Sequence, residues 1–70
     1  MLSMKLVING EQQTFTDGLT LSALLEQLGM KSDRVAVELN REIVVRNLWP
    51  ETHLNPDDKL EIVHFVGGGI

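Results

Sequence analysis

The chain has 70 residues, a formal net charge of −4 and no cysteine. A chain of this length forms one domain with a small core. The lack of cysteine excludes disulfides, iron–sulfur clusters and thiolate metal sites. Only six residues are basic and they are scattered, which argues against nucleic acid as a partner because phosphate binding requires clustered lysine and arginine.

The sequence gives no sign of export, membrane insertion or metal binding. Residues 1–8 lack the long apolar run and the cleavage site of a signal peptide. No stretch approaches the ~20 apolar residues that a membrane span requires. His53 and His64 are isolated and have no metal-like spacing with acidic residues. We therefore expect a cytoplasmic protein that has no metal site and no bound cofactor and that does not associate with membranes.

Two alternating segments near the start predict a β-hairpin. Residues 4–9 alternate along a β-rich run, and residues 12–16 resume the alternation with Phe15 as the inward anchor. Asn9-Gly10 lies between them, and this pair is a strong short-range signal for a hairpin turn.

A short amphipathic helix follows the hairpin. Thr20 is suited to the N-cap because its hydroxyl can accept a hydrogen bond from a free N–H of the first turn. Gly29 is suited to the left-handed residue that ends a helix. Four leucines at i, i+3, i+4 and i+7 form one apolar stripe that we expect to pack on a sheet: Leu21, Leu24, Leu25 and Leu28.

A second hairpin is predicted after the helix. Residues 35–39 form a strand, Asn40-Arg41 a tight turn, and residues 42–45 a short return strand. The apolar residues that share one face of the first of these strands are Val35, Val37 and Leu39.

The last third of the chain leads into a final strand. Residues 46–54 have no clean period, and Trp49-Pro50 there predicts an irregular or short helical segment because proline cannot continue a ladder. Trp49 is expected to cap one end of the core. Residues 55–58 form a turn, and residues 59–66 form the last and most apolar strand.

These elements predict an α+β fold of the β-grasp, or ubiquitin-like, type. One mixed sheet of four to five strands carries a single main helix on one face. The last strand is expected in the centre of the sheet, beside the first strand and parallel to it. Residues 1–66 are assigned to this domain, and residues 67–70 to a flexible glycine-rich tail.

Three consecutive glycines, Gly67, Gly68 and Gly69, follow the last strand. Glycine loses the most backbone entropy on ordering and packs nothing. The run is either an unimportant frayed end or a tail that threads a narrow channel in a partner and presents an unhindered carboxylate there. Val63 and Phe65 point outward next to it if Leu60 points inward, so they form either a docking patch or ordinary sheet surface.

The chain resembles the thiamine-pathway sulfur carrier proteins, small ubiquitin-like proteins that end in Gly-Gly. Most of the matching pieces are ordinary β-grasp patterning, whereas the closing run, residues 62–69, is more specific. The matching pieces are residues 6–10, 21–25, 35–40, 42–44 and 57–69.

The resemblance implies a carrier with no active site of its own. An E1-like adenylating enzyme would consume ATP to adenylate the carboxylate of Gly69 while Gly67 and Gly68 thread its channel. Sulfur from a persulfide enzyme would then displace AMP and leave a thiocarboxylate, and a thiazole synthase would take that sulfur. From their outward facing, we expect Val63 and Phe65 to help dock the adenylating enzyme or the sulfur acceptor.

One residue departs from the family pattern. Ile70 follows Gly69, and an amide at Gly69 cannot be adenylated. Either Ile70 is trimmed, or the chain was altered there, or it is not a working carrier.

Three other functions stay open for this chain. They are the small subunit of molybdopterin synthase, a ubiquitin-like modifier, and a plain β-grasp interaction module in which the glycines play no part.

Overall fold

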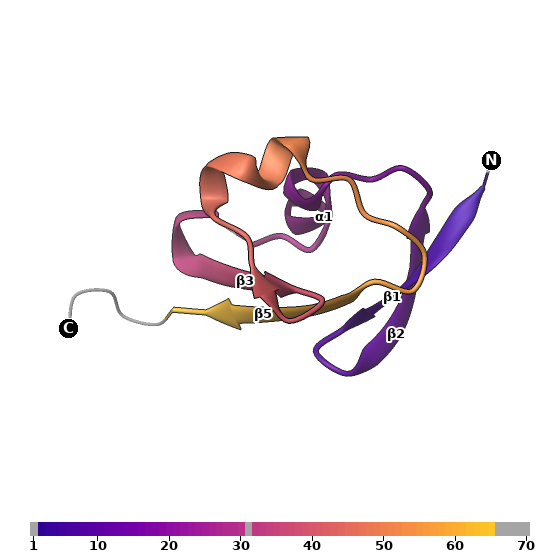
Figure 1. Ribbon diagram of the computed structural model, residues 1–70, viewed down its shortest axis with the longest axis horizontal. Helices are drawn as coiled ribbons and strands as arrows, with labels where there is room; N and C mark the ends of the chain where they lie inside the picture. Colours follow the sequence, from indigo (N-terminus) through magenta and orange to yellow (C-terminus); the bar gives the residue numbers. More distant parts are fainter. Residues whose placement is uncertain (1, 31, 66–70) are drawn as a thin grey trace.

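A computed structural model describes residues 2–30 and 32–65, and in them a five-stranded sheet carries one α-helix (Figure 1). The order of the strands across the sheet is β2-β1-β5-β3-β4. The elements in chain order are β1 (Ser3–Ile8), β2 (Glu11–Thr16), α1 (Leu21–Gln27), the 3-10 turn η1 (Ser32–Arg34), β3 (Val35–Leu39), β4 (Glu42–Ile43), the 3-10 helix η2 (Arg46–Glu51) and β5 (Lys59–His64).

The last strand lies in the centre of the sheet, as the sequence predicts. β5 is parallel to β1, with Ile8 opposite Leu60, and antiparallel to β3, with Val37 opposite Ile62. The other strand pairs are antiparallel hairpins. This mixed sheet with one crossover helix confirms the β-grasp fold.

Both predicted hairpin turns are present. The two central residues have positive φ angles in each turn: 51° and 85° at Asn9 and Gly10, and 51° and 74° at Asn40 and Arg41. Positive φ at both central positions is the requirement of a type I′ turn, whose twist matches that of the flanking strands. Glycine meets it without strain, whereas Arg41 carries a Cβ into a region that costs about 1–2 kcal/mol.

The helix begins and ends at the predicted signals. The Thr20 hydroxyl accepts a hydrogen bond of 3.1 Å from the N–H of Ala23, and Gly29 has a φ of 75°. The predicted stripe needs one correction. Leu21, Leu24 and Leu25 are buried, but Leu28 is the C-cap residue and is only half-buried, packed against the margin of the core.

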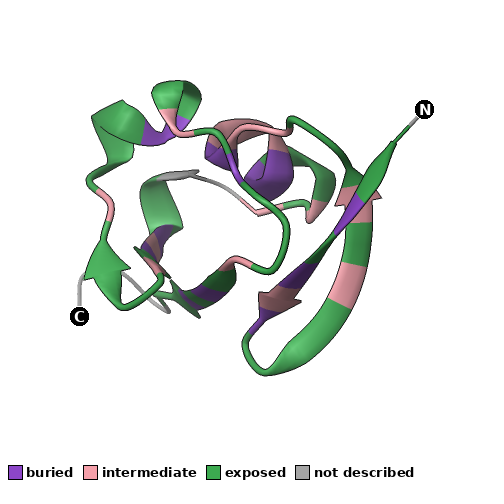
Figure 2. Ribbon diagram, turned by 45° about the vertical axis from the view of Figure 1, so that its right-hand side comes forward, coloured by how far each residue is buried: buried purple, intermediate pink, exposed green. Residues whose placement is uncertain are grey.

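The core lies between α1 and one face of the sheet, where the buried bands of the helix and the strands face one another (Figure 2). Trp49 closes one end of this core and is 3% exposed, as predicted for a cap. Among the residues whose burial the structure describes, the twelve buried ones are all hydrophobic: Met4, Leu6, Ile8, Leu21, Leu24, Leu25, Val35, Val37, Trp49, Leu54, Leu60 and Ile62. Phe15, predicted as the inward anchor, is half-buried at its margin, as is Leu39.

Two predicted strands are shorter in the structure. The return strand predicted to reach Val45 ends at Ile43. The N–H of Val44 still donates to the carbonyl of Val37 at 3.0 Å, but the carbonyl of Val44 accepts a 2.8 Å hydrogen bond from Nε1 of Trp49. The last strand, predicted to reach Val66, ends at His64, and Val66 lies outside the described residues.

Two asparagine side chains fasten β5 to the hairpin turns. Beyond the end of β1, the side chain of Asn9 makes the hydrogen bonds to β5 that a strand backbone would otherwise make. Its Oδ1 accepts from the N–H of Ile62 at 2.8 Å, and its Nδ2 donates to the carbonyl of Ile62 at 3.2 Å. At the other turn, Oδ1 of Asn40 accepts from the N–H of Lys59 at 3.0 Å. Nδ2 of Asn40 donates to Asp58, whose carboxylate also accepts from the N–H of Asn55. β5 is therefore held in position from both flanks.

Candidate functional site

The predicted reactive segment follows directly after the described end of β5. Gly67, Gly68 and Gly69, to which sulfur chemistry and threading were assigned, lie outside the described residues. The described residues closest to them in sequence are those of β5 and Phe65, so the candidate site is the exposed surface of β5 and its neighbouring strands.

The two predicted docking residues face away from the core. Leu60 and Ile62 are 1% and 7% exposed, whereas Val63 and Phe65 are 57% and 53% exposed. The alternation of β5 sets this difference, because successive side chains point to opposite faces of a sheet. Beyond the end of β5, the N–H of Phe65 still donates to the carbonyl of Arg34 at 2.7 Å, which holds Phe65 beside β3.

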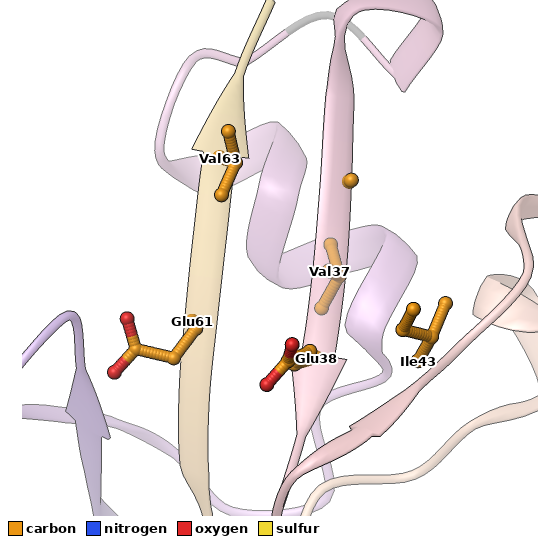
Figure 3. Close-up of a pocket in the computed structure, with 6 residues that line it drawn as sticks. Val37, Glu38, Ile43, Glu61 and Val63 are labelled. Carbon is orange, nitrogen blue, oxygen red and sulfur yellow. The ribbon is translucent and has the colours of Figure 1, made fainter.

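Val63 belongs to a larger apolar area on the face of the sheet opposite α1, which we call the outer patch. It comprises Ala36 on β3, Ile43 on β4 and Val63 on β5, together with Glu38 and Glu61. In Figure 3 the labelled side chains of the patch stand in front of the sheet, and α1 lies behind it. These residues line a shallow depression with a volume of about 90 Å³.

The sequence reasoning identified only Val63 and missed the other four members of the outer patch: Ala36, Glu38, Ile43 and Glu61. Ile43 is 74% exposed on a two-residue strand, so its alternation carried little signal. Glu38 lies opposite both Glu61 and Ile43, and only the pairing register brings these residues from three strands together. The parity of β5 could identify Val63, because that needs one strand alone.

The two histidines lie on different parts of the fold. His64 is exposed at the end of β5, and the backbone of His53 forms an isolated bridge with Thr20. In the described ranges 2–30 and 32–65, no three His, Asp or Glu residues are arranged to hold a metal ion. None of the helices described for this chain is long and apolar enough to cross a membrane.

Strand order, crossover helix and central last strand define a small ubiquitin-like β-grasp protein. Comparison with solved structures agrees. The crystal structure of a thiamine biosynthesis protein, ThiS, from Geobacter metallireducens has a TM-score of 0.82 and is 33% identical, covering 94% of this chain and all of that one. The ThiS family matches residues 6–69. The chain belongs to the ThiS family.

Two curated relatives extend this comparison. A sulfur carrier protein, ThiS, of Bacillus subtilis is 42% identical over 50 residues, which cover 71% of this chain and 76% of that protein. A thiazole synthase of Paramagnetospirillum magneticum is 53% identical over 66 residues, which cover 94% of this chain. This match spans only 20% of the thiazole synthase, so a segment of that longer protein resembles the whole β-grasp domain.

Proposed function

We propose that this chain, as a sulfur carrier of thiamine biosynthesis, carries its sulfur as a thiocarboxylate on Gly69. The match to the ThiS family supports this assignment, because it extends through residue 69 and therefore includes all three glycines. The exposed end of the central strand also supports it, because the last described residues, Val63, His64 and Phe65, lie at the surface.

The chemistry requires activation by another protein. A carboxylate is a poor electrophile, so an E1-like adenylating enzyme joins the Gly69 carboxylate to the α-phosphorus of ATP and releases pyrophosphate. The terminal sulfur of a persulfide enzyme attacks the acyl carbon, and AMP leaves. A second thiol then cleaves the S–S bond of the acyl disulfide, forming a new disulfide and leaving the thiocarboxylate. This chain supplies the acyl group and binding surface, and the partner enzymes supply the catalytic groups.

Glycine suits each of these steps. Without a Cβ, Gly69 leaves its carbonyl carbon open to attack from both sides, and Gly67 and Gly68 pass through a channel too narrow for side chains. Ile70 follows Gly69, so the peptide bond between them must be cleaved before adenylation. A cytoplasmic location would place the chain with an ATP-dependent partner.

Val63 and Phe65 provide contact area next to the reactive segment. Both are more than half exposed, and an apolar pair of this kind beside a working terminus is typical of an interaction site. Thiazole synthase is the acceptor that we assign to this sulfur, because a segment of one such enzyme resembles this chain. Phe65→Asp should weaken binding of the adenylating enzyme or of the acceptor and leave the fold intact.

The decisive experiment compares two purified forms, one ending at Gly69 and one ending at Ile70. Each is incubated with the adenylating enzyme of the same organism and ATP, and intact-mass spectrometry detects the acyl adenylate. We expect the adenylate only on the form ending at Gly69. Equal adenylation of the Ile70 form would refute the assignment of Gly69, and no adenylation of either form would refute the carrier mechanism.

A further inference from the structure

We propose that the outer patch is the docking surface for thiazole synthase, and that it binds an apolar side chain of that enzyme flanked by basic groups. This proposal rests on the proposed function for the identity of the partner. It adds Ala36, Ile43, Glu38 and Glu61 to the contact surface, none of which lies in the glycine run or next to it in sequence.

The pairing register determines the arrangement of the patch. Glu61, Glu38 and Ile43 lie in one row across β5, β3 and β4, because Glu38 pairs with Glu61 on one side and with Ile43 on the other. Ala36 pairs with Val63 in the next row of the same face. The depression between these side chains is lined mainly by carbon atoms, so it fits an aliphatic side chain of a partner.

The two carboxylates indicate the charge of that partner. Glu38 and Glu61 are directly opposite on neighbouring strands, where like charges destabilise a sheet. Both are exposed, and within residues 2–30 and 32–65 neither side-chain carboxylate has a hydrogen-bond or ion-pair partner. An arginine or lysine of a partner would relieve this repulsion, and charge complementarity of this kind sets specificity and association rate.

The position of the patch favours the sulfur acceptor as the occupant. Val63 belongs to the patch and lies two residues before Phe65, the last described residue, so a protein bound there contacts the strand that immediately precedes the glycine run in sequence. In the P. magneticum protein a domain similar to this one shares a chain with the thiazole synthase. Covalent linkage of this kind maintains a high effective concentration of two parts that must meet.

The experiment measures binding of thiazole synthase from the same organism by isothermal titration calorimetry. The test variant is the double charge reversal E38K/E61K. The matched control is E11K/E26K, which changes the net charge equally at exposed acids on β2 and α1. We expect E38K/E61K to bind at least about tenfold more weakly than the wild type. Both double variants lose the same amount of long-range electrostatic attraction, which salt screens, and apart from this loss E11K/E26K should bind like the wild type.

Two additional measurements separate the possible failures. Thermal unfolding verifies the fold of each variant, and E38Q/E61Q, which retains shape without charge, replaces the reversal if that protein is unfolded. Equal binding of the test and control variants would overturn the docking surface. Lost binding of the adenylating enzyme with unchanged binding of thiazole synthase would overturn the occupant. If the wild type binds thiazole synthase but forms no thiocarboxylate, the docking surface stands and the proposed function fails.

Discussion

The two faces of the sheet contrast within a single strand. On the face covered by α1, Leu60 and Ile62 are almost completely buried, and they contact a core of purely hydrophobic residues. On the outer face, Val63 and Ile43 expose more than half of their area, and acids lie beside them. Hydrophobic burial explains the first set of side chains and leaves the second set unexplained.

This difference separates the buried residues that stabilise the fold from the exposed residues that are available to a partner. A domain of this size has a small core, so it depends on nearly every contact beneath α1. The exposed apolar residues of the outer patch contribute less to the free energy of unfolding than the buried residues do. Substitutions on the two faces should therefore have different effects, and the predictions below proceed from the largest effect to the smallest.

The largest effect is expected from Leu25→Ala. Leu25 is 2% exposed at the centre of the helix stripe, and truncating a buried leucine to alanine costs about 2–5 kcal/mol of the free energy of unfolding. This is a large share of the stability of a small domain. Urea denaturation followed by circular dichroism measures it. An unchanged midpoint would contradict the packing of α1 on the sheet.

Asn9→Ala tests the side-chain hydrogen bonds that join the first hairpin turn to β5. The substitution leaves the N–H and carbonyl of Ile62 without their side-chain partners, and unsatisfied groups of this kind cost about 1–3 kcal/mol. Hydrogen exchange should show faster exchange of the Ile62 amide. Gln12→Ala, an exposed position on β2, is the control and should stay within about 0.5 kcal/mol of the wild type.

Glu38→Gln should stabilise the domain, which distinguishes the outer patch from the core most directly. Removing one of two facing carboxylates relieves a repulsion, and cross-strand pairs of this kind contribute about 0.2–1 kcal/mol. The gain should shrink at high salt because exposed charges are screened. Glu26→Gln on α1 is the control. A loss of stability in Glu38→Gln would show that the Glu38 carboxylate has a partner within the domain.

The smallest effect is expected from Val63→Ala. Its side chain is exposed, so the free energy of unfolding should change by less than about 0.5 kcal/mol. Ile62→Val, the neighbouring position on the buried face, removes one methyl group and should cost about 0.5–1.5 kcal/mol. Equal losses at the two positions would show that the outer patch is covered within the domain.

The sequence predicted the parts of this molecule that depend on local chemistry. Asn9-Gly10, Thr20 and Gly29 act through their own backbone angles and hydrogen bonds, and alternation along β5 determined the facing of Val63 from a single strand. The outer patch depends on registers between strands that are distant in sequence, such as Glu38 with Glu61. No local pattern encodes that pairing.

The ends of the shorter strands were also beyond local patterns. Residues 42–45 contain three apolar residues in sequence, which favours a longer strand than the one observed. The indole of Trp49 donates to the carbonyl of Val44. This side-chain hydrogen bond spans only five residues, but alternation of apolar residues does not reveal it.

The central position of β5 also has a mechanical consequence. β5 is bonded along one side to β3 and along the other to β1 and the side chain of Asn9, and these hydrogen bonds run across the strand. A pull on Phe65 along the strand direction therefore loads the bonds on both flanks together, in shear, and does not open them one at a time like a zipper. Although its core is small, the domain therefore resists tension that is applied at Phe65 along the direction of β5.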